Sequence, residues 1–238
     1  MTCRGCPGTV QPWPSFDAMA KTILCFGDSN TWGCVADYVE TGMPSARYDN
    51  GTRWPRVLAG ELGEGYEVIE EGLCGRTSIY TDPDAVYKNA EPYLLPCLLS
   101  HRPLDLVILM LGTNDLRLCF HPDDHHLADG ISRLVDIIKG CKECGEGNNP
   151  PRILIISPPH IIKPDGRKDF YTARGEEAGV RRSRLFKSAY QALAFEKGCW
   201  FLDAGEITKT DSADGLHITG ESHRSLGQAA AAAVPGIL

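Results

Sequence analysis

The chain has 238 residues, of which 42% are hydrophobic and 23% charged, and its formal net charge is −7. These values are typical of one globular domain that is long enough to bury its own core. The negative balance argues against nucleic acid or an anionic membrane as a partner, because phosphate groups are bound by clustered Lys and Arg. The sequence also contains no apolar run of about 18 residues, the length that a membrane-spanning helix requires.

Residues 1–18 are rich in Pro, Gly and Cys. They lack the apolar core of about 7–15 residues that a secretory signal contains. We therefore expect a flexible extension over residues 1–18, a single domain over residues 19–238 and a cytoplasmic location.

Apolar, strand-like runs recur along the chain at residues 22–26, 66–70, 104–111, 152–157 and 199–203. The third and fourth runs are almost continuously apolar, which is typical of strands covered on both faces of a sheet. Helical patterns separate the runs and cover residues 54–62, 127–138, 176–197 and a final alanine-rich helix capped by Thr219 and ended by Pro235. This alternation predicts a parallel sheet between two helical layers, a three-layer α/β/α sandwich.

The ten cysteines raise the question of disulfides or zinc. The two C-x-x-C pairs, Cys3/Cys6 and Cys141/Cys144, lie too far apart in sequence for a compact zinc ribbon. Cys25 lies inside the first apolar run, as a small core residue would. We expect reduced, mostly buried thiols and no metal.

Chemically distinctive blocks follow four of the five strand-like runs. They are Gly27-Asp-Ser29, Glu71–Thr77, Gly112–Asp115 and Asp214–His217. In parallel α/β folds the functional site lies beyond the carboxyl ends of the strands, so we expect these blocks to meet.

The first and last blocks together can form a nucleophilic site. A serine hydroxyl is a weak nucleophile and needs a base within hydrogen-bond reach. His217 can supply that base if Asp214, three residues earlier, holds its other ring nitrogen. Ser29 would then be the nucleophile.

The oxyanion of an acyl-transfer reaction also needs preorganised donors. The backbone N–H groups of Ser29 and Gly75 and the side-chain amide of Asn114 form a suitable set. Taken alone, Asn114 is equally well explained as the cap of a following helix.

The four blocks, in this order, resemble the SGNH (GDSL-type) hydrolase superfamily. Phe26–Gly33, Ile69–Thr77 and Pro103–Asp115 look like its bacterial arylesterase/acyltransferase branch. The resemblance implies a flavodoxin-like, five-stranded parallel sheet of order 2-1-3-4-5. It also implies hydrolysis of short-chain aryl, alkyl and acetyl esters without a cofactor, with acyl transfer to alcohols or peroxide in some relatives. One departure is Glu70, where many members carry asparagine.

Matched residue by residue, the resemblance assigns the nucleophile to Ser29 and the rest of the triad to Asp214 and His217. It assigns the oxyanion donors to Gly75 and Asn114 beside Ser29. Trp32 is a candidate wall of the acyl pocket, with core packing as the alternative.

Other residues have weaker claims to the site. His160 follows the fourth strand without a nearby carboxylate, so we expect a pocket-lining or surface role. His121, His125 and His126 lie among acidic residues and fit a solvated helix start better than a metal site. The long polar segment 161–179 is expected to select substrate, although a plain surface loop or an oligomer contact would also explain it.

We expect a serine esterase that acts on a small-molecule ester and leave a homo-oligomer open. A carbohydrate O-acetyl esterase is an alternative within the same class. A flavodoxin-like module that binds phosphate or a nucleotide at residues 27–31 is the alternative from another class, although the usual glycine-rich phosphate motifs are missing from the sequence.

Overall fold

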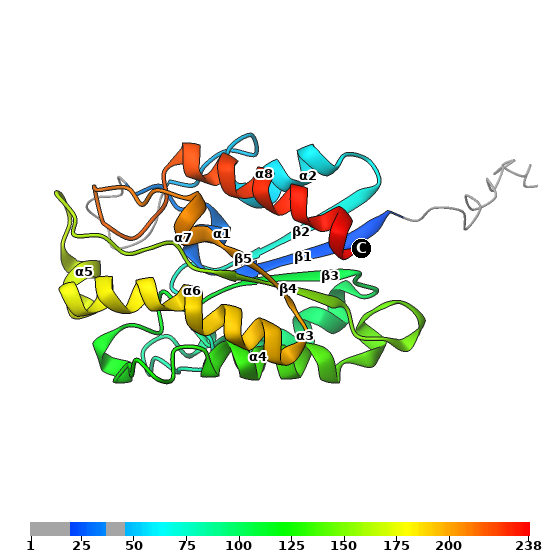
Figure 1. Cartoon of the computed structure of the whole chain (residues 1–238), viewed down its shortest axis with the longest axis horizontal. Helices are drawn as coiled ribbons and strands as arrows, with labels where there is room; N and C mark the ends of the chain where they lie inside the picture. Colours follow the sequence, from blue (N-terminus) through cyan, green and yellow to red (C-terminus); the bar gives the residue numbers. More distant parts are fainter. Residues whose placement is uncertain (1–19, 37–45) are drawn as a thin grey trace, which may run out of the picture.

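The computed structural model describes residues 20–36 and 46–238 (Figure 1). Its core is a five-stranded, all-parallel sheet in the order β2-β1-β3-β4-β5, which confirms the predicted topology. The extension expected over residues 1–18 lies outside the described residues. Within the described ranges, no helix combines the length and the apolar character needed to cross a bilayer.

The strands are β1 (Lys21–Gly27), β2 (Tyr66–Gly72), β3 (Leu106–Met110), β4 (Arg152–Ser157) and β5 (Trp200–Asp203). The α-helices are α1 (Ser29–Trp32), α2 (Trp54–Leu62), α3 (Ala90–His101), α4 (Asp129–Gly140), α5 (Asp169–Ala173), α6 (Glu177–Lys197), α7 (Ala204–Ile207) and α8 (Gly220–Ile237). Short 3-10 helices are η1 (Val86–Lys88), η2 (Leu118–Phe120), η3 (Lys142–Cys144) and η4 (Glu146–Asn148).

The two faces of the sheet support separate hydrophobic cores. Leu24 and Phe26 of β1 pack toward α3, α4 and α6, whereas Ile23 and Cys25 pack toward α2, α7 and α8. This alternation follows from the two-residue period of a strand. Figure 1 shows the two helical layers on opposite sides of the sheet.

The register brings the carboxyl ends of the central strands to one level. Gly27, the last residue of β1, pairs with Gly72 of β2 and with Met110 of β3. The loops that follow these strands therefore leave the sheet side by side, at the edge where the sequence predicts the site.

Two helical features differ from the predictions. Helix α3 was not predicted, because Pro92 and Pro96 interrupt its pattern. Pro92 lies in the first turn, where a missing N–H costs little, and α3 continues through Pro96. The expected stop at Pro235 is also wrong, since α8 runs on to Ile237.

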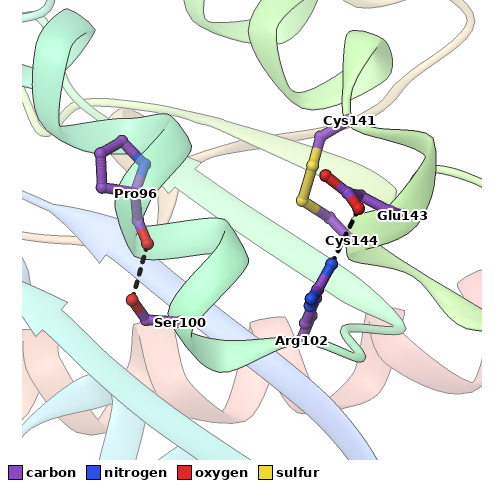
Figure 2. Close-up of a disulfide and its surroundings, with 6 residues drawn as sticks. All are labelled: Pro96, Ser100, Arg102, Cys141, Glu143 and Cys144. Atoms are coloured by element: carbon purple, nitrogen blue, oxygen red, sulfur yellow. Dashed lines mark hydrogen bonds and ion pairs between the residues drawn. A yellow bond between two sulfur atoms is a disulfide. The ribbon is translucent and has the colours of Figure 1, made fainter.

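The expectation of reduced thiols is wrong for Cys141 and Cys144, which form a disulfide. Cys141 follows α4 directly, and the single turn of η3 brings the two Cα atoms to 5.3 Å, within the usual range for a disulfide. Figure 2 shows this bond near the carboxyl end of α3, beside the 2.9 Å ion pair of Arg102 and Glu143. In α3 itself, the Ser100 hydroxyl donates to the Pro96 carbonyl (2.8 Å). The six other described cysteines are free.

Candidate active site

Ser29 is the first residue of α1, the one-turn helix directly after β1. Gly27 makes this tight turn feasible, because a Cβ there would collide with Thr31 Oγ1 and the Met110 carbonyl oxygen. Asp28 caps the helix, its Oδ1 accepting a hydrogen bond from the Asn30 backbone N–H (3.0 Å). The strand, the glycine and the cap together fix Ser29 at the edge of the sheet.

The structure brings Ser29, His217 and Asp214 into one hydrogen-bonded chain. Ser29 Oγ lies 2.9 Å from His217 Nε2, and His217 Nδ1 lies 2.6 Å from Asp214 Oδ2. A carboxylate only accepts, so the ring proton resides on Nδ1 and Nε2 is left to accept the serine proton. All three residues are buried, although they line a pocket.

Asn30 was not singled out in the sequence, yet it fastens the His217 loop beside Ser29. Its Nδ2 donates to the Leu216 carbonyl (3.4 Å), and its Oδ1 accepts from the Ile218 backbone N–H (3.1 Å). The residues on either side of His217 are thus tied to α1. The only sequence feature that could have indicated this role is the position of Asn30 directly after Ser29.

The three expected oxyanion donors lie at the same edge. The backbone N–H groups of Ser29 and Gly75 have no hydrogen-bond acceptor among the described residues, which leaves them available to a ligand. Gly75 has φ of 78°, a conformation that disfavours any residue with a Cβ. Asn114 lines the pocket with both residues and donates through Nδ2 to the Arg76 carbonyl (3.0 Å).

Arg76 supports the loop that carries Gly75. Its buried guanidinium donates to the carbonyl oxygens of Gly27 and Glu71 and lies 4.2 Å from the centre of the Phe26 ring. Glu70 plays a different part, because it accepts two hydrogen bonds from Arg53 (2.9 Å each) at the start of α2. Although this chain has Glu70 where many family members carry asparagine, the Gly75 loop is still supported by Arg76.

Two buried carboxyls lie near the donors. Burial raises the pKa of Asp28 to about 6, and its Oδ2 contacts Asn114 Nδ2 at 3.5 Å. Burial also raises the pKa of Asp115 to about 7. Asp115 accepts hydrogen bonds from the Ser78 backbone (2.9 Å) and hydroxyl (2.7 Å), which joins the loops after β2 and β3.

A pocket of about 480 Å³ opens at Ser29 and His217. Much of its wall is apolar or aromatic. Its other lining residues are Trp32, Cys34, Val35, Ala36, Leu73, Cys74, Gly75, Tyr87, Lys88, Asn114, Arg167, Phe170, Arg174, Asp214 and Leu216. Trp32 lies where a pocket wall was expected.

His160 lies apart from this pocket. Its ring packs so closely on Gly205 of α7 that a Cβ there would collide with it, and it does not line the cavity. Burial lowers its pKa. The expected pocket-lining role is therefore not supported, because the chain after β4 directs His160 toward α7.

Segment 161–179 supplies one wall of the pocket through Arg167, Phe170 and Arg174. The Phe170 ring stands edge-on to the His217 imidazole, with 5.7 Å between the ring centres. The segment therefore touches the candidate base directly.

The histidines near residue 121 lie outside the pocket, and exposed His126 contacts Asp129 (2.8 Å). Among the described residues, only Glu71, Cys97 and His101 bring three metal-type ligand atoms within 4.8 Å of one another. The Arg76 guanidinium already lies 4.0 Å from the Glu71 carboxylate, so Glu71 has a cationic partner without a metal ion.

Comparison with known proteins gives a consistent result. Residues 25–224 match the model of the GDSL-like lipase/acylhydrolase family. An aryl esterase of M. smegmatis is 40% identical (TM-score 0.83), and Est24, a carbohydrate acetylesterase from Sinorhizobium meliloti, is 36% identical (TM-score 0.84). A putative arylesterase from Agrobacterium tumefaciens str. C58 is 34% identical (TM-score 0.80). Each of these alignments covers 92% of this chain and 100% of the other. Among curated proteins, no significant match is found.

The fold, the Ser–His–Asp geometry and the comparisons define a carboxylic ester hydrolase of the serine type. The chain belongs to the GDSL-like lipase/acylhydrolase family. This membership excludes the alternative reading as a phosphate-binding module at residues 27–31.

Proposed function

We propose that Ser29 is the nucleophile, His217 the general base and Asp214 the group that orients the base. Ser29 Oγ attacks the ester carbonyl as His217 Nε2 takes its proton. His217 then gives that proton to the departing alcohol, which leaves an acyl-enzyme on Ser29. Water, deprotonated by His217, attacks the acyl group and restores the free serine. The 2.9 Å contact of Ser29 Oγ with His217 Nε2 is the observation that carries this proposal.

The oxyanion of each tetrahedral intermediate would be held by the N–H groups of Ser29 and Gly75 and by Asn114 Nδ2. The two free backbone donors and the nearby amide support this assignment. Removing one donor of this kind typically costs about 100- to 1,000-fold in kcat.

The proposed substrates are short-chain esters, aryl and alkyl acetates above all. The aryl esterase and carbohydrate acetylesterase names of two relatives support this class, and so does the largely apolar pocket beside Ser29. An acetylated carbohydrate is the second candidate, favoured by the 36% identity to Est24. Transfer of the acyl group to an alcohol or to peroxide would follow the same acyl-enzyme, if such an acceptor replaces water.

A fluorophosphonate probe tests the nucleophile. We expect one covalent label, mapped to Ser29 by mass spectrometry, and loss of p-nitrophenyl acetate hydrolysis in Ser29→Ala. Ser188→Ala, which removes an exposed hydroxyl on α6, is the matched control and should behave as the wild type. Unchanged hydrolysis by Ser29→Ala would overturn the assignment.

One series of esters can measure the preference for the acyl part and the preference for the alcohol part of the substrate separately. We expect a higher kcat/KM for p-nitrophenyl acetate than for the octanoate, in line with the acetylesterase name of the relative Est24. The kcat/KM for acetylated xylose is then compared with the kcat/KM for phenyl acetate. A higher value for the sugar ester assigns the carbohydrate alternative, and a higher value for the aryl ester assigns the aryl one.

We also propose a cytoplasmic location, because six of the eight described cysteines are free and the one disulfide among them, Cys141–Cys144, closes only a local turn. Fractionation of the native host with an antibody against the protein tests it. Recovery outside the cytoplasm would contradict it.

A further inference from the structure

Arg174 connects segment 161–179 to the proposed oxyanion hole. It lies between α5 and α6, and its side chain is almost completely buried. Its Nε donates to the Thr113 carbonyl (2.9 Å), Nη1 to the Phe170 carbonyl (2.9 Å) and Nη2 to Asn114 Oδ1 (2.7 Å). All three nitrogens of the guanidinium are therefore engaged, and one of them holds the Asn114 side chain.

This contact determines which way the Asn114 amide faces. A guanidinium has only N–H donors, so it accommodates the amide oxygen and repels the amide NH₂. With Oδ1 held by Arg174, Nδ2 must face the opposite side. There one N–H reaches the Arg76 carbonyl at 3.0 Å, and the group lines the pocket. The other N–H has only the Asp28 Oδ2 contact at 3.5 Å, which is longer than an ordinary hydrogen bond. A flipped amide would instead present an oxygen to the oxyanion.

Arg174 keeps its charge in this buried place. Burial lowers its pKa to about 10, so the guanidinium remains protonated at neutral pH. The buried Asp28 and Asp214 carboxyls favour the charged form. A cation near the oxyanion hole also stabilises the negative charge that develops there.

We propose that Arg174 is a positioning residue for ester hydrolysis, which acts by locking Asn114 with its amide NH₂ toward the oxyanion. The proposal rests on the proposed function of Asn114. It also gives segment 161–179 a role in the chemistry, because the same guanidinium holds the Phe170 carbonyl and Phe170 packs against His217.

A double-mutant cycle separates this role from simple support of the fold. Arg174→Lys keeps the charge but cannot make three planar contacts, and Arg174→Gln also removes the charge. We expect each to lower kcat for p-nitrophenyl acetate about 10- to 100-fold, with KM changed less than about 3-fold. In the Asn114→Ala background the same substitutions should have almost no further effect on kcat. Additive losses would overturn the proposal. If Arg174→Gln does not fold, the Arg174→Lys cycle decides.

Chemical rescue provides a second, independent readout. Arg174→Ala leaves a guanidinium-sized space, so added guanidinium chloride at a non-denaturing concentration should restore part of kcat. Sodium chloride at equal ionic strength should not, and Arg174→Ala/Asn114→Ala should show no rescue. Arg182→Ala, which removes a half-buried arginine paired with Asp124 outside the pocket, is the matched control. Rescue that persists without Asn114 would overturn the proposal.

The two proposals can fail separately. If Ser29→Ala abolishes hydrolysis but the Arg174 and Asn114 effects are additive, only the Arg174 role is wrong. If Ser29→Ala retains hydrolysis, the proposed function itself is wrong.

Discussion

Asp214 holds His217 at two different atoms. Oδ2 accepts from the imidazole Nδ1 at 2.6 Å, and Oδ1 accepts from the His217 backbone N–H at 3.0 Å. Oδ1 also accepts from the Leu216 backbone N–H (2.9 Å). One carboxylate therefore orients the ring and closes the turn that carries it.

Substitutions at Asp214 should separate these two tasks. Asp214→Asn keeps an oxygen for the turn, but its NH₂ faces Nδ1 and forces the proton onto Nε2. We expect kcat to fall about 10,000-fold with little loss of stability. Asp214→Ala should also lower the free energy of unfolding, by about 1–3 kcal/mol for each buried N–H left unpaired. Ester kinetics measure the loss of kcat in both variants, and urea denaturation measures their loss of stability. Full activity in Asp214→Asn would contradict the orienting role.

The thiol of Cys74 should react faster than its buried neighbours. A hydrogen bond from Cys34 lowers the pKa of Cys74, and the charges of Arg47 and Lys88 act in the same direction. Iodoacetamide at neutral pH should therefore modify Cys74 before Cys34. The added group lies in the pocket and should slow p-nitrophenyl acetate hydrolysis.

Peptide mapping against time, together with residual activity, checks this order. Cys74→Ala should be protected from inactivation. Cys119→Ala is the control, because Cys119 is exposed outside the pocket, and this variant should be inactivated as the wild type is. Inactivation of Cys74→Ala at the wild-type rate would show the prediction to be wrong.

Glu70 should contribute strongly to stability. Its carboxylate contacts Arg53 at both oxygens, and both side chains are more than four-fifths buried, with 14% and 9% exposed. Glu70→Ala leaves the Arg53 charge without this partner and should lower the free energy of unfolding by about 2–4 kcal/mol. Glu67→Ala, at an exposed position of the same strand, should change it by less than about 0.5 kcal/mol. Equal effects of the two substitutions in urea denaturation would refute this prediction.

Asp115 should make the protein less stable as the pH rises. Its pKa of about 7 in the folded state lies above the ordinary 3.8, so folding favours the protonated form. That contribution is complete below pH 4 and is lost as the pH rises through 7. The slope for one carboxyl is at most about 1.4 kcal/mol per pH unit.

Comparing Asp115→Asn with the wild type isolates this effect. The stability difference, mutant minus wild type, should increase between pH 4.5 and 7.5 in denaturation experiments. For Asp124→Asn the difference should stay constant over this range, because Arg181 and Arg182 hold the pKa of Asp124 below its usual value. A flat profile for Asp115→Asn would contradict the buried, protonated carboxyl.

The sheet and the meeting of the four blocks were predictable because both follow from local patterns. A buried strand is an apolar run, and the adjacent strands β2, β1 and β3 end at one edge of the sheet, so Gly75, Ser29 and Asn114 had to lie close together. His217 comes from beyond α7, after the edge strand β5, and the contacts of Asn30 with its loop hold it beside Ser29.

Helix α3 was not predicted because its prolines interrupt the helical pattern. The Cys141–Cys144 disulfide was not predicted because it depends on the geometry of a local turn, which the sequence spacing does not specify. Arg174 could not be found because it contacts Asn114 across 60 residues of sequence, and no spacing rule connects them.

Ser29 and His217 are 188 residues apart in the chain. The ribosome must therefore release all residues up to His217 before Ser29 can contact this side chain. The helix that follows His217, α8, packs on α2 so closely that Gly227 has no room for a side chain against Val57 and the Trp54 carbonyl. Under the proposed mechanism, a chain that ends before His217 has the serine without its base, so we expect ester cleavage to begin only after His217 and α8 have folded onto the sheet.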